Sequence, residues 1–447
     1  MGEELTRGPV IPVMLRFAGP MILGDLLQQC YNIADTLIVG RFLGTDALAA
    51  VGSAFTLMTF LTSILLGLAM GSGTVFSIRF GQRDEQGLRE GILASFVLLA
   101  AVAAALNVLV YAGMDGILWF LRVEGEIARL LEEYLTVIFA GLAGIFLYNY
   151  FASLLRALGD SVAPLIFLAC SAVLNIALDL WFVVGLGRGV AGAAEATVLS
   201  QYLSGVGLAI YAVRRLPQLR RLRGTPLRAA RVREIAGFSA LTCAQQSIMN
   251  LGILAVQGLV NSFGGTVMAA FAAAVKIDAF AYLPVQDFGN ACSVFLAQNY
   301  GAGERSRLRE GLRAAAVMAV LFGLLSSAVV WIFAGPLMGL FVPPGEAAVV
   351  AEGVRYLRIE GAFYWGIGLL FLFYGLYRAV GRPGMSVVLT VISLGTRVAL
   401  AYALAALPAV GVVGIWWSVP IGWLLADLAG AGYFFLRRER LLTPGRV

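Results

Sequence analysis

The sequence of 447 residues contains no histidine and only four cysteines. Without histidine it has no imidazole metal ligand and lacks the side chain that usually titrates near neutral pH, so any proton chemistry must use carboxylates. The cysteines have no spacing typical of a metal site or a disulfide framework, and we interpret them as small core residues. They are Cys30, Cys170, Cys243 and Cys292. With no histidine and no nucleophile beside a base, the sequence does not indicate an enzyme.

Charge is also scarce. Only 13% of the residues are charged, whereas 60% are hydrophobic and the mean hydropathy is +0.87. Ordinary soluble domains have about 25% charged residues, and a soluble chain of this length would form two or three domains with polar surfaces. No long segment supplies such a surface, so the composition indicates a membrane protein. The net charge of +6 does not indicate nucleic-acid binding, because nearly all basic residues lie in short loops between apolar stretches.

The sequence contains an internal repeat. Gly81 and the segment 88–91 recur as Gly301 and the segment 308–311, at a spacing of 220. Farther on, the segment 156–159 is echoed at a spacing of 222. Duplication of about half of so apolar a chain is typical of a transporter built from two homologous helix bundles.

Twelve apolar stretches are long enough, at about 20 residues each, to cross the ~30 Å hydrocarbon layer. They lie near 17–40, 52–78, 91–113, 134–155, 163–185, 191–213, 234–260, 267–298, 311–335, 354–377, 384–406 and 411–436. Six spans per half make each half begin and end on the same side, so the repeat is parallel rather than inverted. The predicted fold is an all-α integral membrane protein with twelve transmembrane helices in two pseudo-symmetric six-helix bundles.

The predicted spans divide the chain into an N-terminal segment, an N-lobe, a basic linker, a C-lobe and a tail, at 1–16, 17–213, 214–233, 234–436 and 437–447. Most of the 32 Lys and Arg fall on the side that holds both termini. The positive-inside rule therefore predicts a multi-pass protein of the plasma membrane with both termini in the cytoplasm. The arginines of the linker could contact anionic lipid headgroups, but they are more simply interpreted as a topology anchor.

Polar residues inside the spans are candidates for function, because a carboxylate in hydrocarbon costs several kcal/mol. The first span carries a stripe on one helical face, made of Asp25, Gln28, Gln29, Asn32, Asp35 and Thr36. The fifth span carries Ser171, Asn175 and Asp179 at steps of four residues. At ~1.5 Å rise per residue, Asp35, Asp179 and Thr197 lie at similar depth, so we expect these three and Asn175 to share one site.

This set of two carboxylates, an amide oxygen and a hydroxyl suits Na⁺ as a metal ligand set. Alternatively, the two carboxylates held close and dry would keep one proton between them. A third possibility is that Asp179 and Asn175 only bind each other. Glu195, two residues before Thr197, could join the site but is more simply placed at the outer interface.

The second half has a polar face without carboxylates on its first span, which we interpret as cavity lining; it consists of Thr242, Gln245, Gln246, Asn250, Gln257 and Asn261. Charged residues follow on later spans at Lys276, Asp278, Asp287 and Arg397, of which Arg397 takes the place that the repeat assigns to Asn175. These four could form a second substrate or coupling site, or an internal ion pair. Candidates for the substrate cavity are Gln28, Asn32, Gln245, Gln246, Lys276, Asp278, Asp287 and Arg397.

The sequence resembles the multidrug and toxic compound extrusion (MATE) transporters over its whole length. The motifs that carry the resemblance lie at 19–32, 34–36, 39–44, 48–52, 71–74, 157–160, 175–179, 189–201 and 298–303. The resemblance implies two lobes, export of organic compounds driven by inward Na⁺ or H⁺, and a cation site at Asp35, Asn175, Asp179 and Thr197. Some members use acids in the seventh and tenth spans; none is evident here, so we place coupling in the first half.

We therefore predict an antiporter, coupled to Na⁺ or H⁺, that exports organic, cationic or amphipathic drugs by alternating access. Cation binding at Asp35 and Asp179 from outside would stabilise a conformation that releases substrate outward. One alternative is a flippase for lipid-linked precursors, although such relatives commonly add two spans for which the chain has no room. Another is a non-transporting receptor. We expect small organic substrates, no cofactor besides the coupling ion, no nucleic-acid partner and a monomer in the lipid bilayer.

Overall fold

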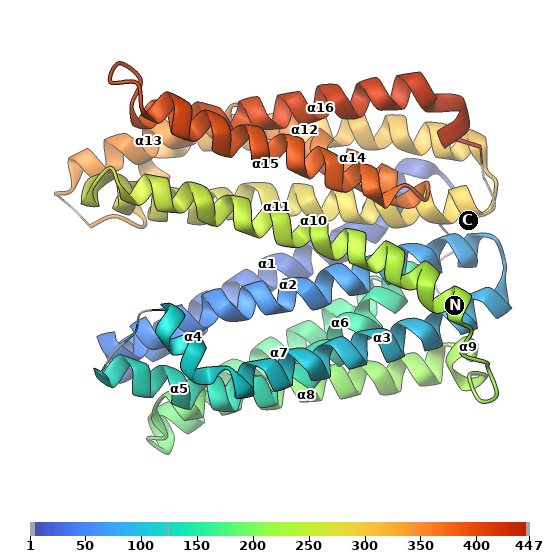
Figure 1. Cartoon of the computed structure of the whole chain (residues 1–447), viewed down its shortest axis with the longest axis horizontal. Helices are drawn as coiled ribbons and strands as arrows, with labels where there is room; N and C mark the ends of the chain where they lie inside the picture. Colours follow the sequence, from blue (N-terminus) through green and yellow to red (C-terminus); the bar gives the residue numbers. More distant parts are fainter. Residues whose placement is uncertain (1–4, 122, 124, 344, 444–447) are drawn as a thin grey trace. The chain divides into compact units, whose positions relative to one another are not determined.

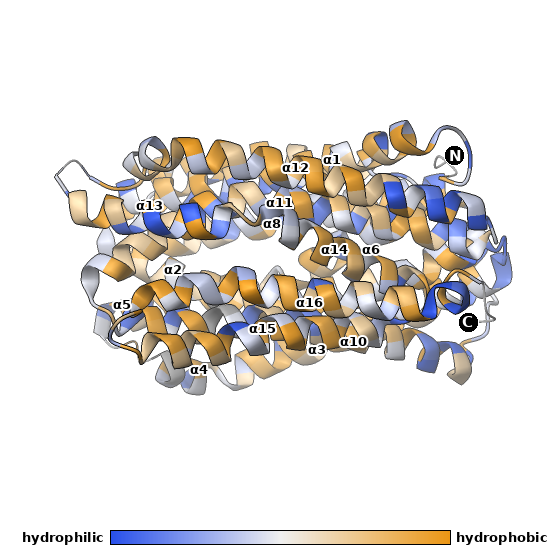
Figure 2. Cartoon of the chain, turned by 90° about the horizontal axis from the view of Figure 1, so that it is seen from above, coloured by the Kyte–Doolittle hydropathy of each residue, from blue (hydrophilic) through white to orange (hydrophobic). Residues whose placement is uncertain are grey.

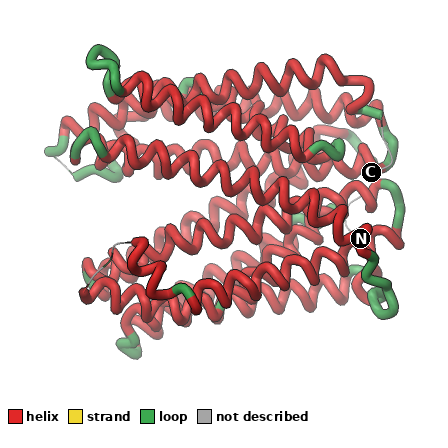
Figure 3. The backbone as a smooth tube through the Cα atoms, viewed as in Figure 1, coloured by secondary structure: helices red, strands yellow, loops and turns green. Residues whose placement is uncertain are grey.

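The computed structural model describes residues 5–121, 123, 125–343 and 345–443. Throughout this part the chain forms helices and no strands (Figure 3). Hydrocarbon offers the backbone no hydrogen-bond partner, so an apolar span satisfies its own N–H and C=O groups by forming a helix. Hydrophobic residues run along the helices, and hydrophilic residues are concentrated towards helix ends (Figure 2). The all-helical membrane fold expected from the sequence is confirmed.

The helices pack into two compact units. The N unit contains Gly19–Cys243, and the C unit contains Leu5–Ala18 together with Ala244–Val447. Both borders fall inside continuous helices, α1 (Val10–Leu43) and α10 (Ala229–Asn261). The beginning of each of these helices therefore packs with the unit formed by the other half of the sequence.

Close contacts explain why the start of α10 belongs to the N unit. A Cβ atom at Gly71 would lie 2.6 Å from the Cα atom of Ser239, so only glycine allows this approach. The hydroxyl groups of Ser72 and Ser239 hydrogen-bond at 2.9 Å. Nearby, Arg231 pairs with the buried Glu90 at 3.3 Å. Backbone contact, hydrogen bond and ion pair together fix this segment.

The start of α1 is held in the C unit by hydrogen bonds to its preceding backbone. Leu5 N donates to Gln298 Oε1 at 3.2 Å, and Arg307 donates to the carbonyl oxygen of Gly8 at 2.6 Å. Asn299 donates to the carbonyl oxygen of Leu5 at 3.2 Å. These side chains satisfy backbone groups that precede the first helical turn.

The other helices of the N unit are α2 (Thr45–Gly81), α3 (Glu85–Ala112), α4 (Met114–Leu121), α5 (Gly125–Ala140), α6 (Leu142–Ala157), α7 (Val162–Asp179), the π-helical turn η1 (Leu180–Gly185), α8 (Gly189–Arg215) and α9 (Pro217–Arg220) (Figure 1). Helices α6 and α8 touch backbone to backbone, since a Cβ at Gly205 would lie 2.5 Å from the carbonyl oxygen of Gly144. This contact holds α8 firmly, and α8 carries one of the predicted site residues.

The other helices of the C unit are α11 (Gly265–Gly301), α12 (Arg305–Gly339), α13 (Ala347–Gly361), α14 (Tyr364–Ala379), α15 (Pro383–Ala405) and α16 (Val412–Leu441) (Figure 1). Aromatic rings fill part of its core: Phe271 stacks on Trp416 with centroids 5.5 Å apart, and Tyr356 meets Trp416 edge to face at 4.9 Å. Such pairs add specific geometry to the burial of large apolar surfaces.

Within the described residues, nine helices are long and apolar enough to cross a membrane, and two bent pairs raise this to eleven. The pairs are α5 with α6, bent by 46°, and α13 with α14, bent by 50°. Helix α10, of 33 residues, is the twelfth segment and is more polar because of its glutamine-rich face. These segments correspond to the twelve predicted spans.

Local details differ from the sequence prediction. The fourth and tenth spans are broken helices, and α4 and η1 were not predicted. No disulfide joins the four cysteines, which all lie in the described part of the chain. Cys30 and Cys170 are exposed on their helices, Cys243 is half-buried, and Cys292 is buried. The interpretation of all four as core residues was therefore wrong for Cys30 and Cys170, since an apolar span has an outer face as well as an inner one.

Candidate functional site

The carboxyl groups of Asp35, on α1, and Asp179, the last residue of α7, lie close enough together for their charges to interact. Asp179 is fully buried, and Asp35 is half-buried with its Oδ1 atom enclosed. The α-helix changes into the π-helical turn η1 directly after Asp179. Such wider turns are frequent at functional sites.

Asn175 and Thr197 complete the polar set in the N unit. Asn175 precedes Asp179 by one helical turn, and its Nδ2 donates to Thr197 Oγ1 on α8 at 3.3 Å. The Thr197 hydroxyl in turn donates to the carbonyl oxygen of Ala193 at 3.1 Å. The amide of Asn175 is thus directed to Thr197 rather than to Asp179, and its Oδ1 atom keeps both lone pairs.

Four buried oxygen atoms of this cluster have no hydrogen-bond donor within the described residues: Asp35 Oδ1, Asn175 Oδ1 and both carboxylate oxygens of Asp179. No arginine or lysine in the described part of the chain pairs with either aspartate. Two ionised carboxylates so close would repel each other, and buried acceptors without donors are costly. The cluster is therefore suited to hold a positive ion, either a proton or a small metal cation.

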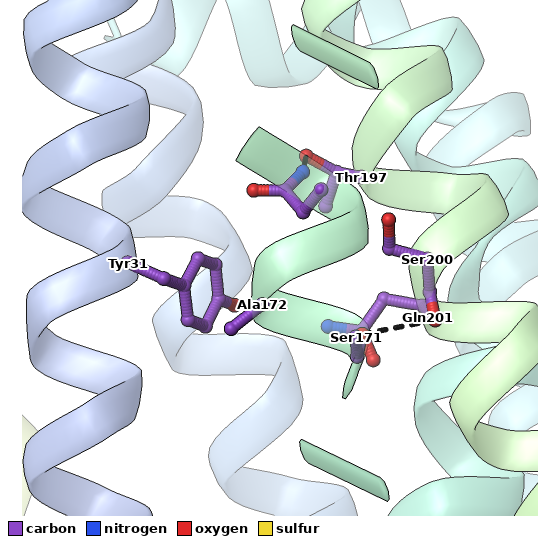
Figure 4. Close-up of a pocket in the computed structure, with 7 residues that line it drawn as sticks. Tyr31, Ser171, Ala172, Thr197, Ser200 and Gln201 are labelled. Carbon is purple, nitrogen blue, oxygen red and sulfur yellow. Dashed lines mark hydrogen bonds between the residues drawn. The ribbon is translucent and has the colours of Figure 1, made fainter. Parts of the chain in front are cut away.

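A small, partly open cavity adjoins the cluster (Figure 4). It is lined by Tyr31, Ser171, Ala172, Asn175, Thr197, Ser200 and Gln201. The ring of Tyr31 extends from α1 towards α7, and Ser171 donates to the carbonyl oxygen of Ser200 at 3.0 Å. The volume in which the centre of a water molecule fits is about 10 Å³. This is room for about one water molecule. It is the right size for an ion or its water, and far too small for an organic substrate.

Other polar residues near the cluster have separate roles. Tyr31 and Tyr134 lie within electrostatic reach of Asp35 and Asp179, and no pattern in the sequence distinguishes Tyr134 on α5 from other aromatic residues. Glu195 pairs with Arg188 at 2.7 Å, so its carboxylate is directed to an arginine and not to the cluster. The substrate-cavity candidates Gln28 and Asn32 are half-buried on the same α1 stripe.

The C unit contains a second buried acidic cluster. Asp278 on α11 accepts hydrogen bonds from Tyr356, at 3.1 Å, and from Tyr364. Glu360 on α13 lies beside Asp278, and Arg397 on α15 is within electrostatic reach of both. The three charged side chains are 9% exposed or less.

Glu360 is an acid of the tenth predicted span, where we expected none from the sequence. That expectation was wrong. The predicted span began at 354, which put Glu360 near a membrane surface, but α13 begins at Ala347 and places Glu360 deep in the unit, 3% exposed. The acid could have been found in the sequence, because the predicted span already contained it.

The remaining candidates of the second half do not gather at this cluster. Asp287 is buried farther along α11, while Gln245 and Gln246 are buried on α10. Lys276 is exposed and forms no ion pair with Asp278. Of the two internal partners that the sequence suggested for Asp278, only Arg397 lies near it.

The model of the MatE family matches residues 20–181 and again residues 242–403, once in each half of the chain. The chain belongs to the MatE family. The family expected from the sequence motifs and the internal repeat are both confirmed. A relative from Bacillus subtilis, named probable multidrug resistance protein YpnP, is 29% identical over 96% of this chain and 96% of its own. A relative from Shewanella oneidensis, named FAD transporter, is 26% identical over 95% and 94%.

Solved structures show the same architecture for this MatE chain. A structure described as the outward-facing conformation of a multidrug resistance MATE family transporter of the MOP superfamily has a TM-score of 0.92 and 25% identity. The alignment covers 98% of each chain. The fold of this multi-pass membrane protein is therefore shared along its whole length.

Proposed function

We propose that this MatE protein is a secondary antiporter that exports organic compounds in exchange for an inward-moving H⁺ or Na⁺. The observation that carries the proposal is the buried Asp35 and Asp179 pair, which has no positive partner within the described part of the protein. The names of several relatives, among them probable multidrug resistance protein and multidrug export protein MepA from Staphylococcus aureus, support drugs as substrates.

The pair can couple ion binding to a conformational change because its two carboxylates come from different helices, α1 and α7. With a cation between them, the carboxylates attract a common charge and hold α1 against α7. Without it they repel. Since α1 also carries the half-buried Gln28 and Asn32, movement of this helix would change the surface offered to a substrate. Each ligand then favours a different state, as alternating access requires.

Asn175 and Thr197 contribute neutral oxygens to the proposed site. If Na⁺ is the coupling ion, these oxygens would replace part of its water shell. If H⁺ is the coupling ion, one proton shared by the two carboxylates is enough, and the neutral groups keep the helices in register. We further propose that the protein works as a monomer in the plasma membrane with both termini in the cytoplasm, as the loop arginines suggest.

The proposal is tested by efflux of a fluorescent organic cation such as ethidium from proteoliposomes, under proton and Na⁺ gradients that are imposed separately. One of the two gradients should drive efflux, and Asp35→Asn should abolish it while the protein stays folded. Asp25→Asn is a matched control, because Asp25 lies on the same stripe of α1 about 15 Å from Asp35. Wild-type efflux by Asp35→Asn would refute the assignment. Because one relative is named an FAD transporter, efflux of FAD is measured alongside.

A further inference from the structure

Asp427 on α16 is a buried acid of the C unit that lies outside both clusters described above. Its side chain is 8% exposed, and neither carboxylate oxygen has a hydrogen-bond partner in the described residues. Its neighbours on α16 at positions 425 and 428 are exposed, so Asp427 lies on the inner face of the helix. A carboxyl group placed in this way needs something that neutralises it.

Asp427 lies near the middle of α16, one of the helices that are long and apolar enough to cross a membrane. Helix α16 runs from Val412 to Leu441, so Asp427 is about 22 Å from either end at ~1.5 Å rise per residue. This is the depth at which an ionised carboxylate is most costly. A residue there that only filled space would be expected to be apolar.

The two repeats differ at the position of Asp427. At the spacing of 222 that relates Gly192 to Gly414, Gly144 corresponds to Gly366 and Gly205 corresponds to Asp427. In the N unit the two glycines touch, since a Cβ at Gly205 would lie 2.5 Å from a carbonyl oxygen of α6. In the C unit a Cβ at Gly366 would lie 3.7 Å from Asp427 Oδ2. Where the N unit has a close contact between two glycines, the C unit therefore has the carboxyl group of Asp427 beside Gly366.

No charged side chain of the neighbouring helices neutralises Asp427. On α14, Tyr374 lies within electrostatic reach of Asp427. Arg378 of the same helix donates to Asn290 Oδ1 at 2.9 Å rather than to Asp427. On α15, Arg397 serves the Asp278 cluster. On α13, Glu352 accepts from the indole of Trp416 at 2.7 Å, and Glu360 lies beside Asp278. Within the described residues, both carboxylate oxygens of Asp427 are therefore buried without a hydrogen-bond donor.

We propose that Asp427 is a second proton-binding site, which loads and releases a proton during the transport cycle. The ligand is a proton rather than Na⁺, because Na⁺ needs several oxygen ligands, whereas a proton needs only the carboxylate itself. Proton binding turns the carboxylate into a neutral carboxylic acid, and its release restores the charge, so atoms and charge balance without another reactant. The role in the cycle rests on the antiporter function proposed above, but proton binding at Asp427 does not.

The test uses the purified full-length protein in lipid nanodiscs. Infrared difference spectra between mildly acidic and alkaline pH report the C=O stretch of a protonated carboxylic acid, and a pH-sensitive dye counts the protons taken up. Asp427→Asn should lose one such band and take up about one proton fewer than wild type. Asp427→Glu should restore the proton and shift the band. Asp35→Asn, as the matched variant in the N unit, should remove a different band.

Equal proton uptake by Asp427→Asn and wild type would overturn the proposal, and so would an Asp427 band that stays unchanged over the whole pH range. Loss of the band on adding Na⁺ at constant pH would also overturn it, because the site would then take Na⁺. If wild type fails to move ethidium under any ion gradient, the antiporter function is refuted, yet the spectra still decide whether Asp427 binds a proton. If Asp427→Asn does not fold, the band shift in Asp427→Glu decides the assignment.

Discussion

Replacing Asp179 by Asn should remove the ion dependence of this protein's stability. The change keeps the shape of the side chain but removes one of the two charges of the buried pair. At a separation of about 4 Å and an effective dielectric constant of about 20, one unit charge acting on another is worth ~4 kcal/mol. Since 1.4 kcal/mol is about tenfold, a cation at the site should bind about 10³-fold more weakly in Asp179→Asn.

In the protein without a cation, the interaction between the two charges is a repulsion of similar size and destabilises the folded state. In wild type, two ionised carboxylates repel each other, whereas in Asp179→Asn a single carboxylate faces an amide that can donate to it. The variant should therefore be more stable than wild type at alkaline pH without Na⁺. It should be less stable than wild type, or equal to it, when the coupling ion saturates the wild-type site.

Thermal unfolding in detergent, followed by the loss of the monodisperse peak in size-exclusion chromatography, measures this difference. Wild type should melt at higher temperature as Na⁺ is added or as pH falls, according to which ion it uses. Asp179→Asn should show little response to either ion, and Asp25→Asn should respond like wild type. A variant that keeps the full wild-type response would contradict the assignment of Asp179 to the ion site.

Two further predictions concern the packing of the N unit. Both are tested by comparing the melting temperatures of the variants with that of wild type. Glu90 has a side chain 1% exposed and pairs with Arg231, so Glu90→Gln should destabilise the unit by about 1–3 kcal/mol. The exposed Glu126 is its control: Glu126→Gln should melt like wild type, and equal losses in both would contradict the reasoning. Gly205→Ala would place a Cβ atom 2.5 Å from a carbonyl oxygen of α6 and should cost about 1–3 kcal/mol. Gly366→Ala, whose nearest contact would be 3.7 Å, should be tolerated; if Gly205→Ala is tolerated equally well, the close helix contact does not exist.

The sequence predicted well those features that depend on composition and periodicity. The apolar stretches gave the membrane helices, and the spacing of polar residues on α1 and α7 selected Asp35, Asn175 and Asp179, which the structure brings into one cluster with Thr197. Helical periodicity is enough for this, because residues at steps of three and four share a face. The role of the cluster as an ion site stays a prediction.

Features that depend on tertiary packing were not predictable in this way. The apolar run from Leu180 to Gly185 is compatible with a regular helix, so nothing in it distinguishes the π-helical turn. Glu360 stood inside the predicted tenth span and could have been selected, but the bend between α13 and α14, which helps to decide its depth, depends on packing. The packing of the start of α10 with the N unit depends on a backbone contact between Gly71 and Ser239, residues that are far apart in the sequence.

The two units share one scaffold but treat buried negative charge differently, and this difference indicates how they divide the work. At the repeat position where the N unit has Asn175, the C unit has Arg397. The C unit therefore carries its own permanent cation beside Asp278 and Glu360, whereas Asp35 and Asp179 of the N unit are accompanied by the neutral Asn175 and Thr197. A permanent partner cannot leave, so it stabilises one arrangement; an exchangeable ion can stabilise an arrangement and then release it. The paired acids of the N unit are thus suited to the ion response proposed above. In the C unit we assign a similar capacity to Asp427, whose carboxylate oxygens have no hydrogen-bond partner in the described residues.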